Sequence, residues 1–242
     1  MPYPLHRFRA FADLTPAEER ALQALGDTEI VHRKGETFQR EGDDVQGFHL
    51  HVSGWIISSV VLRTGDRLIQ KVHLPGDMLG TPNAALARAA DSLTAITGAT
   101  TAFVPFARFG QLFTDMPRLA ALCTVAVQME RLMLLDMLAA ANNASSNERL
   151  ARFLLDLHQR LDAFGAVKDD AFHIPLTQEQ MSDLLGITPV HMNRTVRTFD
   201  KNGWIARHDH YVKLLDIPAL RAISPLPLRH PAFEPGWLPA PR

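Results

Sequence analysis

The sequence predicts an α+β fold with a β-rich N-terminal part, a long helix and a C-terminal helical part. Short runs of β-branched and aromatic residues, separated by glycine turns, fill the chain up to residue 116. From Pro117 to about Asn142 there is no internal glycine or proline, which is typical of one long helix. Helix-start signals recur beyond it, and prolines are frequent after Ile223. These divisions predict four segments, residues 1–116, 117–145, 146–223 and 224–242.

The composition excludes several classes of protein. Of the 242 residues, 46% are hydrophobic and 21% are charged, as in a globular protein. No apolar run reaches the ~18 uncharged residues of a membrane span, and no apolar segment follows Arg7 as in a secretory signal, so we expect a cytoplasmic protein. The single cysteine, Cys123, excludes an internal disulfide and any site with four cysteine ligands. Because the net charge is −1, affinity for nucleic acid would require a local basic patch.

The N-terminal part begins with a helix and continues as a β-barrel or sandwich. Thr15 is a natural N-cap, Pro16 suits the first turn and Glu18 completes a capping box, so a helix should run to about Leu25. Strands such as 47–52 should then alternate with polar glycine turns. The turns are at 34–36, 41–44, 52–54, 63–66 and 74–77.

Two apolar stripes run along the long helix. One contains Leu122, Val125, Met129, Leu132 and Ala139, and its neighbour contains Leu119, Ala126, Met133, Met137 and Ala140. Two apolar faces need two partners, so we expect the barrel on one side and the same helix of a second chain on the other. A helix buried in its own domain is the alternative. The residues expected in the dimer contact are Leu122, Val125, Met129 and Leu132.

A pair of capped helices is predicted in the C-terminal part. A polar break at 142–147 precedes one helix, from Glu148 to about Phe164. Further on, Thr177 and Gln180 form a capping box, and the helix that they begin ends at Gly186. Another helix begins at once, with Thr188 as N-cap and Pro189 in its first turn, which makes a helix-turn-helix. A hairpin at 204–215 would complete a winged helix.

The helix that follows Thr188 has an apolar face and a donor-rich face. Met192, Val196 and Phe199 recur at helical spacing as the buried stripe. The opposite face offers hydrogen-bond donors for bases and phosphates, and a valine for a thymine methyl. The predicted DNA-binding residues are Thr177, Thr188, Val190, His191, Asn193, Arg194, Arg197 and Lys201. A solvated charged helix face is the alternative reading.

The motifs in this order resemble the Crp/Fnr family of bacterial transcription regulators, over about residues 10 to 223. They are Leu176-Thr177-x-Glu179-x-Met181-x-x-Leu184-Leu185-Gly186-Ile187-Thr188, Val190-His191-x-Asn193-Arg194-Thr195, Val52-Ser53-Gly54 and Leu74-Pro75-Gly76-Asp77-Met78-Leu79-Gly80. The resemblance implies an N-terminal jelly roll of cyclic-nucleotide-binding shape and a homodimer joined through the long helix. It further implies double-stranded palindromic DNA and RNA polymerase as partners.

The resemblance places the effector pocket at Gly80, Thr81, Asn83, Ser92 and Leu93. In members that respond to cyclic AMP, a Gly-Glu pair and a later Arg-Ser pair hold the phosphate. Here the corresponding positions read Gly80-Thr81 and Asp91-Ser92. An aspartate beside a phosphate would repel it, so an effector other than cyclic AMP is predicted and its identity is left open. The iron–sulfur sensing of another branch is excluded by the single cysteine.

Other readings remain. A regulator of the same fold could act without a ligand, or respond to haem through His32, His49, His51 or His73, or to redox through Cys123. Since the apolar residues of 48–52 alternate with His49 and His51, both histidines are expected to point outward. No metal site and no catalytic motif is found, which disfavours an enzyme. The proline-rich tail is expected to be extended or disordered, with packing through Phe233 and Trp237 as its anchor.

Overall fold

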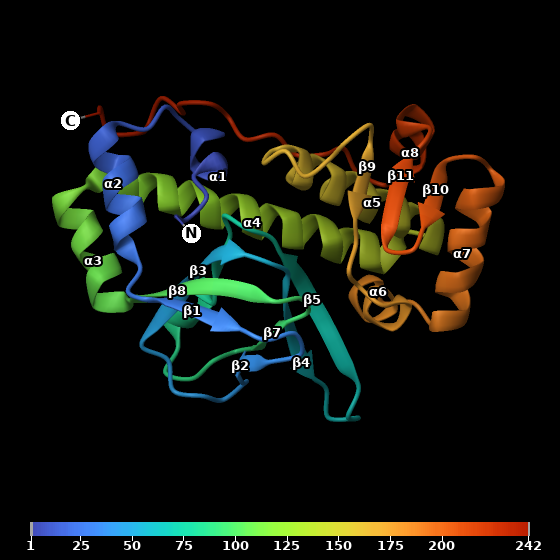
Figure 1. Ribbon diagram of the computed structural model, residues 1–242, viewed down its shortest axis with the longest axis horizontal. Coiled ribbons are helices and arrows are strands. Elements are labelled where there is room, and N and C mark those ends of the chain that lie inside the picture. Colours follow the sequence, from blue (N-terminus) through green and yellow to red (C-terminus); the bar gives the residue numbers. More distant parts are fainter. Residues whose placement is uncertain (1, 242) are drawn as a thin grey trace. The chain divides into compact units, whose positions relative to one another are not determined.

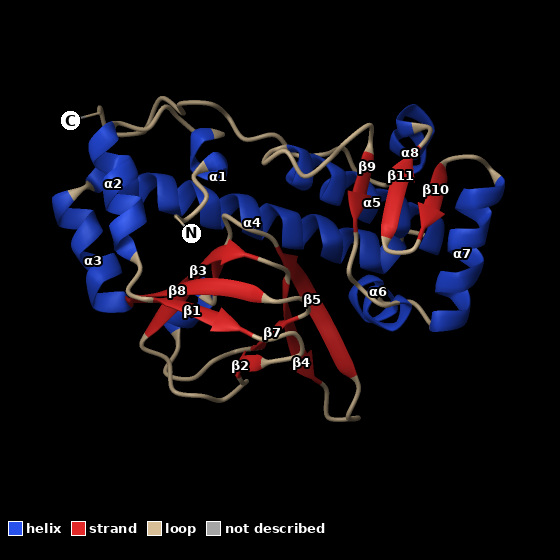
Figure 2. Cartoon of the chain, viewed as in Figure 1, coloured by secondary structure: helices blue, strands red, loops and turns tan. Residues whose placement is uncertain are grey.

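The computed structural model describes residues 2–241, which form two compact units. The first unit contains the residues up to Gly65, Gln70–Arg131 and the stretch from Pro231 onward. The second contains Asp66–Ile69 and Leu132–His230. Figure 1 follows the chain through its elements, and Figure 2 distinguishes helices from strands. The fold is α+β, as predicted, with an N-terminal β domain, a long helix and a C-terminal helix-turn-helix.

Two four-stranded sheets form the N-terminal β domain. One has the strand order β1-β8-β3-β6 and the other β2-β7-β4-β5. The strands are β1 (Glu29–His32), β2 (Thr37–Gln39), β3 (Gly47–Ser53), β4 (Ile56–Val61), β5 (Arg67–His73), β6 (Met78–Leu79), β7 (Ser92–Ala95) and β8 (Ala99–Pro105). Ile56, Leu79 and Leu93, which come from both sheets, share one buried cluster. The sheets therefore face each other around a common core, as in a jelly roll.

Helices cover the outer face of the sheet that contains β3 and β8. They are α1 (His6–Arg9), α2 (Pro16–Leu25), α3 (Phe106–Asp115) and the first half of α4 (Pro117–Asn143), and a short 3₁₀ helix, η1 (Thr81–Ala85), follows β6. The predicted capping box begins α2, where the Thr15 hydroxyl accepts from the Glu18 N–H at 3.2 Å and the Glu18 carboxylate accepts from the Thr15 N–H at 2.8 Å. The core under these helices includes Phe8, Leu22 and Leu119.

Strand β3 is buried on both faces. Phe48, Leu50 and Val52 pack against the helices, whereas the ring of His49 on the other face lies against Phe38 of the second sheet. His51 is 0% exposed. The expectation that these histidines face solvent is therefore wrong, because the second sheet covers the face on which they lie.

The second unit is built around α5 (Ser146–Asp162). Its other elements are β9 (Ala171–His173), α6 (Gln178–Leu185), α7 (Pro189–Lys201), β10 (Ile205–His208), β11 (Tyr211–Leu214) and α8 (Ile217–Ile223). Leu150, Leu154 and Leu157 of α5 are buried, at the helical spacing read from the sequence. Strands β10 and β11 form the predicted hairpin, and β9 adds a third strand to it. Together, α6, α7 and the hairpin form a winged helix-turn-helix.

The tail beyond α8 is held by polar contacts rather than by its aromatic residues. Arg152 of α5 donates to the carbonyl oxygens of Leu226 and Pro227. The Arg229 side chain binds Asp136 of α4, with Nη2 and Oδ1 2.8 Å apart. Hydrogen bonding to Arg229 lowers the pKa of the buried Asp136 carboxyl. Phe233 and Trp237 are 56% and 61% exposed, so the expectation that they anchor the tail is wrong.

Candidate nucleic-acid interface

The helix-turn-helix is shaped by two capped helices and one glycine. The Thr177 hydroxyl accepts from the Gln180 N–H at 3.1 Å, and the Gln180 side chain accepts from the Thr177 N–H at 2.9 Å. Gly186 ends α6 with φ 61° and ψ 40°, the left-handed conformation that favours glycine. Thr188 then begins α7 by accepting from the His191 N–H at 3.3 Å. This short turn fixes the direction in which α7 leaves α6.

Helix α7 has the two faces that its sequence predicts. Met192 and Phe199 are 0% exposed and Val196 is 5% exposed, so this stripe anchors the helix in the second unit. The predicted DNA-binding residues of α7 are all exposed and lie on other sides of the helix. They are Val190, His191, Asn193, Arg194, Arg197 and Lys201.

A shallow groove runs along the exposed face of α7. Its lining residues are Val190, Asn193, Arg194, Arg197, Thr198 and Lys201. Within the part of the chain that the structure describes, the side chains of Arg194, Arg197 and Lys201 form no ion pair. The wing residue Arg207 differs, because its Nη2 lies 2.6 Å from Oδ2 of Asp200. Helix α7 itself therefore contributes positive potential to the interface.

His191 is oriented by the residue that caps its helix. Oγ1 of Thr188 lies 3.0 Å from Nδ1 of His191 and also accepts the His191 backbone N–H. When the hydroxyl proton is donated to Nδ1, a neutral imidazole carries its own proton on Nε2. His191 then offers a donor outward. Thr177 and Thr188 act first as helix caps, and both remain exposed.

The start of α5 lies beside the interface, which the sequence did not predict. A hollow next to the groove is lined by Ser145, Ser146, Asn147, His191, Arg194, Thr195 and Thr198. Ser145 caps α5, and its hydroxyl accepts from the Glu148 N–H at 3.3 Å. The partial positive charge of a helix N-terminus thus adds to that of Arg194. The Ser-x-x-Glu spacing at 145–148 is a local signal for this helix start, but it does not show that the start lies beside α7.

The predicted effector residues lie around a left-handed glycine in the first unit. Gly80, with φ 76°, precedes η1, and a side chain added there would meet Nδ2 of Asn83 at 3.3 Å. Asn83 is 0% exposed; its Oδ1 accepts from the Ala90 N–H, and its Nδ2 lacks a hydrogen-bond partner. Thr81 is half-buried beside them.

The structure does not bring every predicted effector residue to this position. The Ser92 hydroxyl accepts from the Glu41 N–H at 3.0 Å, and Leu93 is buried in the core between the sheets. Asp91 accepts a hydrogen bond from Nε2 of Gln39 at 3.2 Å. Burial, together with the charges of Glu130 and Glu41, raises the pKa of Asp91 to about 6. Near neutral pH this carboxylate would repel an anionic ligand.

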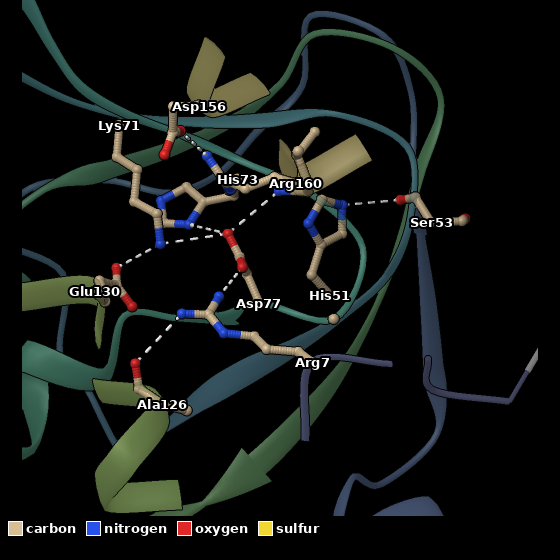
Figure 3. Close-up of polar contacts among 12 residues, drawn as sticks. Arg7, His51, Ser53, Lys71, His73, Asp77, Ala126, Glu130, Asp156 and Arg160 are labelled. Atoms are coloured by element: carbon tan, nitrogen blue, oxygen red, sulfur yellow. Dashed lines mark hydrogen bonds and ion pairs between the residues drawn. The ribbon is translucent and has the colours of Figure 1, made fainter. Parts of the chain in front are cut away.

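A buried ionic cluster ties α4 to the strands of the first unit (Figure 3). Nζ of Lys71 lies 2.7 Å from Oε1 of Glu130 on α4 and 3.3 Å from Oδ2 of Asp77. Asp77 also pairs with Arg7, whose Nη2 donates to the Ala126 carbonyl oxygen at 3.3 Å. Lys71 and Arg7 are thus engaged by carboxylates and a carbonyl. A phosphate would have to displace these partners to use either cation.

The predicted dimer residues do not share one exposed face. Leu122 is 0% exposed and packs in the core of the first unit, and Val125 and Met129 pack against the same core. The expectation that Leu122 contacts a second chain is wrong, because its own barrel and helices cover it. Leu132 is 41% exposed. The large exposed apolar residues of the second half of α4 are Leu132, Leu134, Leu135 and Leu138.

The proposed alternative sensors are in apolar or occupied positions. Cys123 is fully buried, and burial raises the pKa of its thiol to about 12, so it is a neutral thiol. Nε2 of His32 lies 2.8 Å from Oγ1 of Thr101, which lies 3.3 Å from Nδ1 of His49. Burial lowers the pKa of His49 to about 4, so His49 is neutral near pH 7.

The described residues contain neither a membrane-spanning helix nor a cluster of metal ligands. Between residues 2 and 241, no helix is long and apolar enough to cross a membrane. The same stretch contains no group of three or more histidine, cysteine, aspartate or glutamate side chains arranged to hold a metal ion.

Known proteins resemble the chain in both sequence and fold. The Crp-like helix-turn-helix domain family matches residues 148–223. Over 198 residues the chain is 27% identical to the fumarate and nitrate reduction regulatory protein of Salmonella typhimurium, with 79% of this chain and 76% of that protein covered. Over 214 residues it is 28% identical to the nitrogen fixation regulation protein FixK of Bradyrhizobium diazoefficiens, with 88% of each covered.

A solved structure extends the likeness to the fold. FixK2 from Bradyrhizobium japonicum superposes with a TM-score of 0.75 at 20% identity, over 83% of this chain and 98% of that one. The winged helix-turn-helix and the β domain are thus matched together with the long helix between them. Residues 148–223 thus match a Crp-like helix-turn-helix domain, and the chain is similar in sequence and fold to Crp/Fnr transcription regulators.

Proposed function

We propose that the protein is a homodimer that binds a palindromic site in double-stranded DNA and regulates transcription. The observation that carries the proposal is the exposed face of α7, where Arg194, Arg197 and Lys201 line a groove opposite a buried stripe. A capped helix with this division is suited to the major groove. In this proposal residues 1–116 sense an effector, 117–145 dimerise, 146–223 bind DNA and 224–242 form a tail.

Base reading should concentrate in the first half of α7. An arginine can donate two parallel hydrogen bonds to guanine O6 and N7, and the exposed Val190 suits a thymine methyl. Arg197 and Lys201 lie further along the helix and suit phosphates. Asn193, His191, Thr177 and Thr188 complete the proposed contact surface.

The second half of α4 supplies the proposed dimer contact. Leu132, Leu135 and Leu138 recur at helical spacing and are 41%, 49% and 58% exposed. Residues three apart lie on neighbouring sides of a helix, so these leucines form one broad apolar face suited to packing against a second helix. A second copy of α4 would cover them, and a two-fold dimer would place two recognition helices on a palindrome.

The effector is proposed to be something other than cyclic AMP. Asp91 lies near the predicted pocket. It stands at the position where members that respond to cyclic AMP would have an arginine. A regulator without a ligand is the alternative. The buried neutral thiol of Cys123 and the neutral His49 make redox or haem sensing weaker candidates. RNA polymerase is proposed as a partner on family grounds alone.

Selection from a random pool of DNA duplexes tests this function. The full-length protein is expected to enrich a palindrome, and sedimentation at matched concentrations should show two chains per bound duplex. A control protein with Arg194, Arg197 and Lys201 all changed to Gln should enrich nothing. Failure of the wild type to enrich any sequence would contradict the proposal.

A further inference from the structure

Arg149 of α5 bonds the ends of two other helices at once. Its Nε donates to the Ala144 carbonyl oxygen at 3.0 Å, and its Nη2 donates to that of Ala141 at 2.7 Å, at the end of α4. Its Nη1 donates to the carbonyl oxygens of Leu185 at 3.1 Å and Gly186 at 3.3 Å, at the end of α6. All of these residues lie in the second unit.

This arrangement supplies hydrogen-bond donors to carbonyl oxygens that have no partner within their own helix. The last carbonyl oxygens of a helix have no partner within it, and its C-terminus carries a partial negative charge. One guanidinium therefore neutralises two helix ends together. The fixed fork of an arginine can reach acceptors in two directions, whereas a lysine ammonium is a single point.

The contact lies at the turn that directs α7. Gly186 adopts φ 61°, and a side chain added to it would meet Nη1 of Arg149 at 3.6 Å. Thr188, two residues beyond this glycine, is the N-cap of α7. Any shift of the Leu185 and Gly186 carbonyls relative to α4 would therefore redirect α7 from its first residue.

We propose that Arg149 is a positioning residue that fixes the direction of α7 relative to the end of α4. This inference rests on the proposed function: in a dimer joined through α4, Arg149 sets the separation of the two recognition helices. It contributes to the choice of half-site spacing rather than to the reading of bases. A protein without this guanidinium keeps its affinity for one half-site but tolerates a changed spacing.

The test compares three duplexes: the palindrome selected by the wild type, the same palindrome with one base pair inserted between its halves, and a single half-site. The wild type should bind the first at least about ten-fold more tightly than the second. Arg149→Gln should lose about ten-fold on the first duplex, lose little on the half-site and bind the first two nearly equally. Arg149→Lys should lose spacing discrimination as well, because one ammonium cannot span both helix ends. Arg221→Gln, which removes a cation from the exposed side of α8, is the charge-matched control and should behave as the wild type.

Different failures have different meanings. A wild type without preference for any palindrome would contradict the proposed function itself. If the wild type prefers the palindrome and Arg149→Gln discriminates spacing equally well, the positioning role is wrong. An equal loss on the half-site would also overturn it, because Arg149 would then act through DNA contact or general stability. Should the glutamine variant not fold, the lysine variant decides, since the same loss of discrimination is expected from it.

Discussion

In the proposed function, Arg194 contacts a base and Lys201 contacts a phosphate. Arg194 lies in the first half of α7, and Lys201 is its last residue. Arg194→Ala should cost ~1 to 3 kcal/mol on the selected palindrome and little on random DNA, because a bidentate contact with guanine is lost. Lys201→Ala should weaken both and reduce the salt slope by about one, because a phosphate contact is lost. Anisotropy titrations at several salt concentrations measure these effects.

Arg63→Ala, which removes an exposed cation from the turn between β4 and β5, is the control for net charge and should change neither quantity. Equal loss on specific and random DNA by Arg194→Ala would remove the recognition role from α7.

Asp91 should make stability depend on pH. Burial raises its pKa in the folded protein to about 6, from the usual 3.8 of an aspartate. The folded state thus binds the proton more tightly, so this carboxyl favours folding at low pH and that contribution is lost as pH rises toward 6. Asp91→Asn should therefore stabilise the protein near neutral pH by ~1 to 3 kcal/mol and have a much smaller effect near pH 4. Urea unfolding at both pH values measures the difference, and a gain independent of pH would contradict the assignment.

The histidines of β3 show why some residues could not be placed from the sequence. Alternation identified the two faces of residues 47–52 correctly, but it does not say whether the second face meets solvent or another sheet. Phe38 of the second sheet lies against the ring of His49, and His51 on the same face is fully buried. Nonlocal pairing of this kind leaves no local signature in the sequence.

The exposed leucines in the second half of α4 are predicted to hold the dimer together. Leu132→Glu together with Leu135→Glu should convert dimers to monomers, because two charges would enter an apolar seam. Specific DNA binding should fall with dimerisation. Sedimentation velocity measures the first effect and anisotropy the second.

A leucine outside α4 supplies the control. Leu86 is 49% exposed in the first unit, and Leu86→Glu should leave the dimer intact. A double variant of α4 that still sediments as a dimer would place the interface elsewhere.

The sequence predicts the helices and turns better than it predicts which elements pack against one another. Capping boxes at Thr15 and Thr177 and the turn at Gly186 are local signals, and the structure has each of them. The stripe on α4 was assigned by periodicity alone, which cannot tell which neighbour a face meets. Leu122 was therefore placed in a dimer contact although it belongs to the core of its own unit. The four acceptors of Arg149 come from segments whose proximity no spacing rule predicts.

For the whole molecule, cyclic AMP should have no effect. Arg7 is paired with Asp77 and Lys71 with Glu130, so neither cation is available to bind a phosphate. Asp91 is anionic at neutral pH and would repel a phosphate. A large excess of cyclic AMP should change neither the melting temperature nor the affinity for the selected palindrome. A stabilisation of ~2.7 kcal/mol, as expected for a ligand at a hundred times its dissociation constant, would contradict this prediction.

The tail has a consequence for how the chain can be divided. The first part of the tail, up to His230, belongs to the second unit, and Arg229 and Arg152 both bind the buried Asp136. A fragment spanning 132–223 would keep this carboxylate and lose one of its two cations, so it should melt at a lower temperature than a fragment spanning 132–230. Arg229→Gln in the longer fragment should reproduce the loss. A minimal DNA-binding module cut at the end of its last helix would thus be a poor proxy for the same residues in the intact regulator.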